Sequence, residues 1–274
     1  MHAFLLEILR LTVWLVLLAA IFVPLERLVA VRRQRIFRRQ IATDLGYYAL
    51  NSVLTGILLA APLSVAGAAV HHAIPSAVLH AIAGLPLGVK LVLSLLLAET
   101  GLYWGHRLSH EMPLLWRFHA IHHSAEDLDF LTNTRAHPVD MVFTRLCGFI
   151  PVFALGLAQG PGIPAIVVVI SVIWGFFVHA NLRWRFGWLE WLVATPFFHH
   201  WHHTNDAERD RNYAAMLPVL DRVFGTLHMP PAWPSEYGID TPMPASIASQ
   251  LLRPFVRRSM IGTIGSGALR PSAN

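Results

Sequence analysis

Residues 91–110 read LVLSLLLAETGLYWGHRLSH, an apolar stretch that runs directly into a pair of histidines. The apolar segment begins near Leu85 and ends near Tyr103, which is about the length that crosses the ~30 Å hydrocarbon layer of a bilayer as a helix. His106 and His110 follow at positions i and i+4, which lie on one face of a helix, one turn apart. The stretch therefore predicts a membrane helix that presents two imidazoles at one membrane face.

The composition of the whole chain agrees with a membrane protein. Of its 274 residues, 55% are hydrophobic and 14% are charged, whereas roughly a quarter of an average soluble domain is charged. The net charge of +5 comes largely from arginines beside a predicted span, so acidic phospholipids are their expected counter-charge and no nucleic-acid partner is implied. The single cysteine, Cys147, excludes an internal disulfide and a thiolate metal site.

Four further apolar segments accompany this span. They run from about Ala3 to Pro24, Asp44 to Val70, Met141 to Leu157 and Gly162 to His179. The last two are short for full spans and predict a hairpin or a re-entrant pair. An arginine-rich stretch, Glu26 to Arg39, follows the first segment, and the positive-inside rule places it in the cytoplasm with the N-terminus outside.

These patterns define the expected fold. We predict an all-α integral membrane bundle of about four to five segments, placed in a bacterial inner membrane. A histidine-rich, metal-binding cap is expected on its cytoplasmic face, because the clustered histidines fall on the same side as the arginines.

Eleven of the 16 histidines lie between His106 and His203. Beyond the first pair they form two boxes, each with histidines at positions i, i+3 and i+4. The first and last histidine of a box share a helical face, and the middle one points aside, where it can serve a second metal. Eight imidazoles exceed the four to six ligands of one ion and suit two ions. They are His106, His110, His119, His122, His123, His199, His202 and His203.

Imidazole suits iron, zinc, copper and nickel, whereas calcium and magnesium prefer oxygen ligands. One histidine alone is more often a hydrogen-bonded core residue, but eight at one membrane face would each need a polar partner. His137 and His179 lie near the ends of predicted segments on the same side, and we add them as candidate ligands. His71, His72 and His80 are left out because they are expected on the other side of the bilayer, and His200 and His228 because one is the odd member of its box and the other stands alone.

The ordered motifs resemble the fatty acid hydroxylase/sterol desaturase superfamily over roughly residues 95–240. They are Glu99-x3-Tyr103-Trp104-x-His106-x3-His110, His119-x2-His122-His123, His199-x2-His202-His203, Leu220-Asp221-Arg222 and Tyr237-Gly238-Ile239. The resemblance implies a membrane-bound, non-haem di-iron enzyme with two iron ions per chain, which zinc could replace in a purified sample. It also implies O2 as co-substrate, an electron-donor protein (a reductase, ferredoxin or cytochrome-type protein), and a fatty-acyl, sterol-like or ether lipid as substrate.

Polar residues near the boxes are candidates for tuning the histidines, by setting ring tautomers and basicity. They are Glu99, Asp140, Asn181 and Asp221. Hydroxylation is the favoured reaction, and desaturation stays open because both begin with the same hydrogen abstraction. A histidine-rich metal transporter is a distant alternative, since transport needs ionisable ligands within the spans and these carry almost none.

The resemblance also divides the chain. Residues 1–94 hold the N-terminal spans and the basic loop, residues 95–245 a hydroxylase-like catalytic domain, and residues 246–274 a tail expected to be partly disordered. A hydrophobic tunnel between the third span and the Met141–His179 segments is expected to lead to the metals, with Gly101 and Gly175 near its end.

Overall fold

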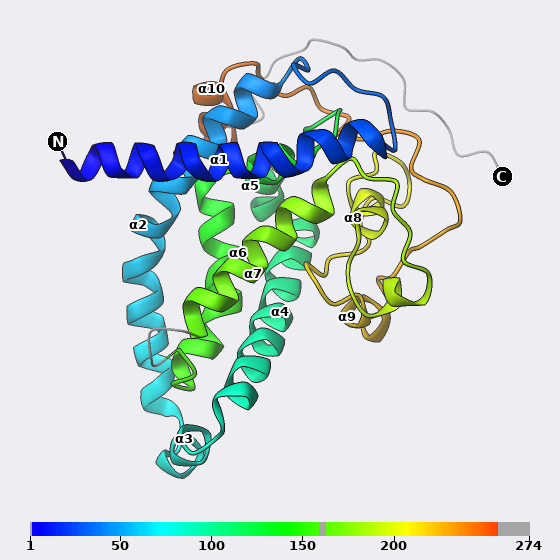
Figure 1. Cartoon of the computed structure of the whole chain (residues 1–274). Coiled ribbons are helices and arrows are strands. Elements are labelled where there is room, and N and C mark those ends of the chain that lie inside the picture. Colours follow the sequence, from blue (N-terminus) through cyan, green and yellow to red (C-terminus); the bar gives the residue numbers. More distant parts are fainter. Residues whose placement is uncertain (1, 159–162, 257–274) are drawn as a thin grey trace.

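The computed structural model describes residues 2–158 and 163–256, and the regular elements in these residues are helices and two isolated β-bridges (Figure 1). Four long helices form the bundle: α2 (Ile41–Ala73), α4 (Leu87–Glu111), α6 (Pro138–Ala154) and α7 (Ile163–His179). At one end, α3 (Ser76–Ala83) joins α2 to α4. The opposite end, called the histidine end below, carries α1 (His2–Leu28), α5 (Pro113–His123) and α8 (Pro196–His202).

Shorter elements complete the described chain. They are η1 (Phe130–Thr134), η2 (Gly187–Trp191), α9 (Val219–Val223), α10 (Ile247–Leu252) and η3 (Arg253–Phe255), where η denotes a 3-10 helix. The link at residues 159–162 and the tail beyond residue 256 lie outside the described residues. Residues 246–256, which we assigned to the tail, are ordered into α10 and η3. Here Gln250 accepts a hydrogen bond from the Tyr47 hydroxyl (3.1 Å), and Phe255 contacts Phe118.

Within the described residues, three helices are long and apolar enough to cross a membrane: α1 over Leu5–Leu28, α2, and α4. Apolar side chains cover their outer surfaces, and Leu9, Val16, Ile57 and Val65 are each more than half exposed. In water such surfaces would be unfavourable, whereas lipid chains solvate them. The expected all-α membrane bundle is confirmed to this extent, while α7 is a shorter apolar helix.

The orientation of α1 was not expected from the sequence. We predicted it as the first span, and its length permits this, but it lies across the ends of α2, α6 and α7 instead of parallel to them (Figure 1). Leu15, Leu18 and Phe22 form the inner stripe of α1. This stripe packs on a cluster that includes Phe130 and Phe176, and Phe22 stacks on Phe130 with ring centroids 5.4 Å apart. The stripe therefore fixes α1 over the bundle end that carries the histidines.

Glycines let α4 and α6 pack backbone against backbone. A Cβ added at Gly101 would lie 2.1 Å from the carbonyl oxygen of Cys147, and one at Gly148 would lie 2.9 Å from the Leu102 side chain. Small residues at such contacts are common between membrane helices because they allow close approach. The expectation that Gly101 borders a tunnel is therefore wrong, since a helix contact fills this position.

Buried charges join the arginine-rich segment to the helices. Arg38 pairs with Asp129 (2.6 Å) and with Asp44 (2.5 Å), and Asp44 also pairs with Arg135 (2.5 Å). The four side chains are almost fully buried, so each charge depends on its partners. This network connects the start of α2 to η1 and to the segment that leads into α6.

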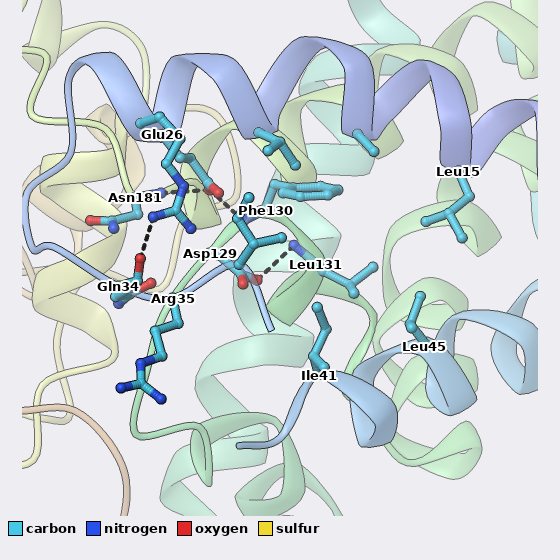
Figure 2. A pocket seen from close by; sticks show the side chains of 14 residues that line it. Leu15, Glu26, Gln34, Arg35, Ile41, Leu45, Asp129, Phe130, Leu131 and Asn181 are labelled. Carbon is cyan, nitrogen blue, oxygen red and sulfur yellow. Dashed lines mark hydrogen bonds between the residues drawn. The ribbon is translucent and has the colours of Figure 1, made fainter. Parts of the chain in front are cut away.

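The end of α1 is tied to the segment that follows α7 (Figure 2). The Glu26 carboxylate accepts hydrogen bonds from the backbone N–H groups of Phe130 (2.8 Å) and Asn181 (2.9 Å). The Asn181 side chain accepts from the N–H groups of Val31 and Arg32 and donates to the Arg32 carbonyl (2.7 Å). These contacts hold the arginine-rich segment against the last turn of α7.

Loss of one charge from the buried network should destabilise the fold. We expect Asp44→Ala to lower the free energy of unfolding by about 3–5 kcal/mol, because it leaves Arg38 and Arg135 buried without their shared carboxylate. Glu7→Ala is the control. It breaks the Glu7–Arg10 pair, whose side chains are 52% and 57% exposed, so solvent screening limits its cost to about 0–1 kcal/mol. Thermal unfolding in detergent compares the two variants, and equal melting temperatures would contradict the role of the network.

Candidate metal centre

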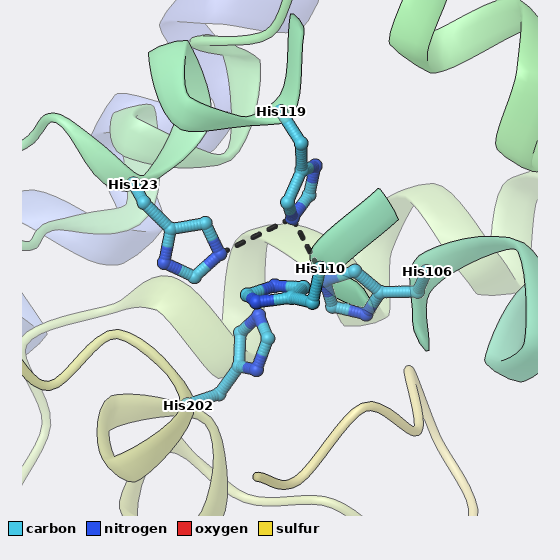
Figure 3. A group of neighbouring side chains, drawn as sticks. All are labelled: His106, His110, His119, His123 and His202. Carbon is cyan, nitrogen blue, oxygen red and sulfur yellow. Dashed lines mark hydrogen bonds between the residues drawn. The ribbon is translucent and has the colours of Figure 1, made fainter. Parts of the chain in front are cut away.

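Nine histidines converge at the histidine end in two groups. The first group is His106, His110, His119, His123 and His202, and the second is His122, His179, His199 and His203. Within each group the nearest ring nitrogens all lie within 4.8 Å of one another. Figure 3 shows the first group, whose rings point toward a common centre from α4, α5 and α8.

The division follows the spacing within each box. His119 and His123, four residues apart on α5, both enter the first group, while His122 between them enters the second. In the other box His199 and His203 enter the second group, while His202 enters the first. The middle histidine of each box thus lies in the group that contains the first and last histidines of the other box. This arrangement matches the expectation that the middle histidine points aside.

The outer nitrogens of six rings are bound to oxygen atoms. In the first group the Nδ1 atoms of His106 and His202 face backbone carbonyls at 2.7 and 2.8 Å, and those of His110 and His119 each face a carboxylate at 3.0 Å. In the second group His122 and His179 face carbonyls at 2.9 and 2.7 Å. A carbonyl or carboxylate can only accept, so each of these Nδ1 atoms carries the proton.

A neutral imidazole protonated at Nδ1 leaves a lone pair on Nε2. The Nε2 atoms of His106 and His119 nevertheless lie 3.1 Å apart, and those of His122 and His179 lie 3.2 Å apart. These contacts set lone pair against lone pair, and no proton is left to bridge them. A cation between the rings removes this conflict, so the donor set fits one metal ion in each group.

Unsatisfied inner nitrogens in the first group support the same conclusion. Ring nitrogens of His110, His199, His202 and His203 are buried without a hydrogen-bond partner. An isolated buried polar atom costs free energy, and native proteins rarely leave one without a role. The inner Nε2 atoms of His110 and His202 belong to the first group, where a metal would serve as their missing partner.

The protein environment keeps these rings neutral. Burial lowers the pKa of His199, His202 and His203 well below the ordinary value, and neighbouring histidines lower it further. A neutral imidazole is the form that binds a metal.

The two groups lie against each other. The rings of His123 and His203 stack with centroids 4.5 Å apart, and those of His199 and His202 stack with centroids 5.2 Å apart. Each pair joins one ring from the first group to one from the second. Two ions held in these groups would be neighbours and could act on one substrate together.

The structure brings nine of the ten predicted ligands together and leaves His137 outside. Its Nδ1 accepts a hydrogen bond from the Val139 N–H (3.0 Å) and caps α6, while its Nε2 faces the Leu251 carbonyl (3.2 Å). Both ring nitrogens are therefore used. His200 also lies outside, between the Tyr237 hydroxyl and the Ala180 carbonyl.

Three other polar candidates hold either a ring or the segment around the rings. Asp140 accepts from Nδ1 of His119 (3.0 Å), so it touches a ring of the first group directly. Asp221 accepts from the N–H groups of Tyr213 (2.7 Å) and Ala214 (2.9 Å), and Glu99 accepts from the N–H of Met216 (2.8 Å). Asp221 and Glu99 thus hold the segment that contains Tyr213, whose carbonyl accepts a hydrogen bond from His106.

Asn181 contacts none of the described ring nitrogens, because its side chain binds the arginine-rich segment. Sequence reasoning did not assign Asp210, whose carboxylate accepts from Nδ1 of His110. It also missed the backbone carbonyls of Arg135, Gly175, Arg211 and Tyr213, which accept from four other rings. Asp210 follows His203 by seven residues and is acidic, which is a signal the sequence offers, whereas a backbone acceptor leaves no mark on residue type.

Comparisons with known proteins match the chain to enzymes that act on lipids. Residues 91–226 match the family model for fatty acid hydroxylase. Ornithine lipid hydroxylase of Rhizobium tropici is 39% identical over 182 residues, which are 66% of this chain and 54% of that protein. Alkylglycerol monooxygenases of Xenopus tropicalis and Danio rerio are 32% and 34% identical over 152 residues, which are 55% of this chain and 33% of theirs.

The chain thus spans about half or less of the length of these relatives. No solved structure matches it. All nine histidines of the two groups fall inside residues 91–226, so the histidine motifs that carry the resemblance lie within the matched residues. The chain belongs to the fatty acid hydroxylase family.

Proposed function

We propose that the chain is a membrane-bound, non-haem di-iron oxygenase that hydroxylates a lipid. The reaction would consume O2 and electrons from a separate donor protein, such as a reductase, a ferredoxin or a cytochrome-type protein. The observation that carries the proposal is the pair of adjacent histidine groups, in which inner lone pairs face one another. Family membership and the activities of the relatives, a hydroxylase and monooxygenases, support an oxygenation over other metal chemistry.

Two bound iron ions would supply the electrons that cleave O2 and an oxidant strong enough for an unactivated C–H bond. The chain's own residues hold the rings in place. Asp140 and Asp210 fix the protonated Nδ1 of His119 and His110, which keeps each Nε2 free. Glu99 and Asp221 act one step further out, through the segment that contains Tyr213. Substitutions in this outer layer should weaken metal binding or activity without removing a ligand.

Desaturation would use the same two groups and is the competing reaction. The relatives, a lipid hydroxylase and monooxygenases, favour hydroxylation. A metal transporter fits the site less well, because the nine histidines gather at one end of the bundle and form no path along it.

We also propose that the histidine end faces the cytoplasm of a bacterial inner membrane. The supporting feature is the arginine-rich segment between α1 and α2, which is tied to η1 and to the end of α7 at this end of the bundle. The positive-inside rule places such segments in the cytoplasm, where soluble electron donors would reach the metals.

Lipid profiles of cells with and without the gene test the reaction. We expect a lipid heavier by one oxygen atom to appear only when the wild-type chain is expressed, because hydroxylation inserts one atom of O2. Growth under 18O2 should label that product. The control is the His119→Ala chain, which should produce none. A product lighter by two hydrogen atoms would replace hydroxylation by desaturation, and unchanged lipids under these conditions would contradict the proposal.

Metal content tests the two groups separately. We expect two iron ions per wild-type chain and loss of about one ion in His119→Ala or His203→Ala, since each variant removes a ligand from one group. His200→Gln is the matched control, because His200 is buried on the same helix as the ligands but belongs to neither group. Elemental analysis of purified protein gives the counts. Full metal content in both ligand variants would exclude the groups as metal sites.

Labelling of single cysteines tests the orientation. In a Cys147→Ala background, Arg33→Cys should react with an impermeant maleimide only in inside-out vesicles, because Arg33 is exposed in the arginine-rich segment. Ser76→Cys, exposed at the start of α3, should react only in intact spheroplasts. The reverse pattern would place the histidine end outside the cytoplasm.

A further inference from the structure

A cavity outside the histidine groups lies beneath α1. Its volume is about 540 Å³, which is in the usual range of ligand pockets. It is lined by α1, α2, η1, α6 and α7. The expected tunnel involved α6 and α7, as here, but the opposite wall comes from α1 and α2 and not from the third predicted span.

The walls of this cavity are mostly apolar. Trp14 and Leu18 contribute from α1, and Val169, Val172 and Phe176 contribute from α7. This wall of α7 leads directly to the second histidine group, because His179 follows Phe176 by one helical turn. An apolar chain would pack well in the cavity and would arrive at the group from the lipid side.

One cation in the cavity has no counter-charge. Arg145 lies on α6 and lines the cavity, and it makes no ion pair or side-chain hydrogen bond among the described residues. None of the described lining residues is acidic. The other lining arginine, Arg10, already pairs with Glu7 (2.6 Å) on the exposed side of α1. An isolated charge among apolar helices is costly, and such residues commonly mark a substrate pathway.

We propose that this cavity binds the substrate as an amphiphile whose anionic group, a carboxylate or a phosphate, pairs with Arg145. The apolar part then packs against α1 and α7. The anionic group supplies the counter-charge that Arg145 lacks, and the apolar walls explain why the ligand is a lipid. This inference rests on the proposed oxygenase function, since it names the class of lipid delivered to the same metal site.

Competition binding measures the preference for a charge. Dansylated undecanoic acid is the probe, bound to the metal-loaded full chain in neutral maltoside micelles, and dodecanoate, dodecyl phosphate and dodecanol compete for it. We expect dodecanoate or dodecyl phosphate to bind at least about tenfold more tightly than dodecanol, as a charged hydrogen bond would produce. The anion that binds better identifies a carboxylate or a phosphate headgroup. Equal binding of all three competitors would overturn the proposal.

Substitution of Arg145 assigns the preference to this residue. Arg145→Gln should abolish it, and Arg145→Lys should keep part of it, because lysine keeps the charge but loses the bidentate geometry. Lys90→Gln is the control, since it removes a cation from a bundle helix at the other end, where Lys90 donates to the Ala83 carbonyl. An unchanged preference in Arg145→Gln would overturn the proposal.

Filling the cavity gives an independent test if Arg145 variants fold poorly. Gly56 lines the cavity, and an added Cβ would meet no atom within 4 Å, so Gly56→Leu should occupy the space without a clash. Leucine also favours a helix over glycine. We expect every competitor to bind several-fold more weakly to Gly56→Leu. Binding should be unchanged in the control Gly88→Leu, whose Cβ also meets no atom within 4 Å. Unchanged binding in Gly56→Leu would count against this cavity.

The outcomes separate this inference from the proposed function. A chain that prefers anionic amphiphiles but yields no oxidised lipid would keep the binding site and refute the oxygenase. A chain that oxidises a lipid without any preference for anions would keep the oxygenase and refute the role of Arg145.

Discussion

Repulsion between imidazole lone pairs is the constraint on which the rest of the structure depends. Six rings are held in one tautomer by oxygen acceptors, and the inner nitrogens of four of them face one another as lone pairs at 3.1–3.2 Å. Such an arrangement is unfavourable by itself and favourable around cations. The fold must therefore hold the rings together firmly enough that metal binding, and not ring rotation, relieves the repulsion.

The fold meets this demand with contacts drawn from the whole chain. The Arg135 carbonyl accepts from His122, while its side chain joins the buried charge network through Asp44. The Tyr213 carbonyl accepts from His106, while its N–H is held by Asp221. At Asn212, the preceding residue, φ is 57°, a left-handed value that asparagine tolerates better than most residues. Metal geometry and fold stability are consequently linked, because the same residues serve both.

Residue type and spacing predicted much of the site. Histidines four residues apart must share a helical face, so the membership of His119 with His123 and of His199 with His203 follows from helix geometry. The assignment of His179 as a ligand was harder, since a single histidine at a helix end has no second histidine at helical spacing beside it. His137 was added on similar grounds, and its cap position follows from the Pro138 that starts α6. Backbone carbonyls and the direction of α1 depend on tertiary packing, which no local pattern records.

Because α1 lies across the end of the bundle, the helices enclose a cavity in addition to being long enough to cross a bilayer. Trp14 and Leu18 of α1 close one side of the cavity, and the last turn of α1, through Glu26, binds the backbone N–H of Asn181, two positions after His179. An apolar helix with exposed leucines on its other side stays in contact with lipid along its length. A lipid chain bound beneath α1 would pack against Phe176, one helical turn before His179 of the second histidine group. These apolar surroundings would suit an oxidation in which water would compete with the substrate.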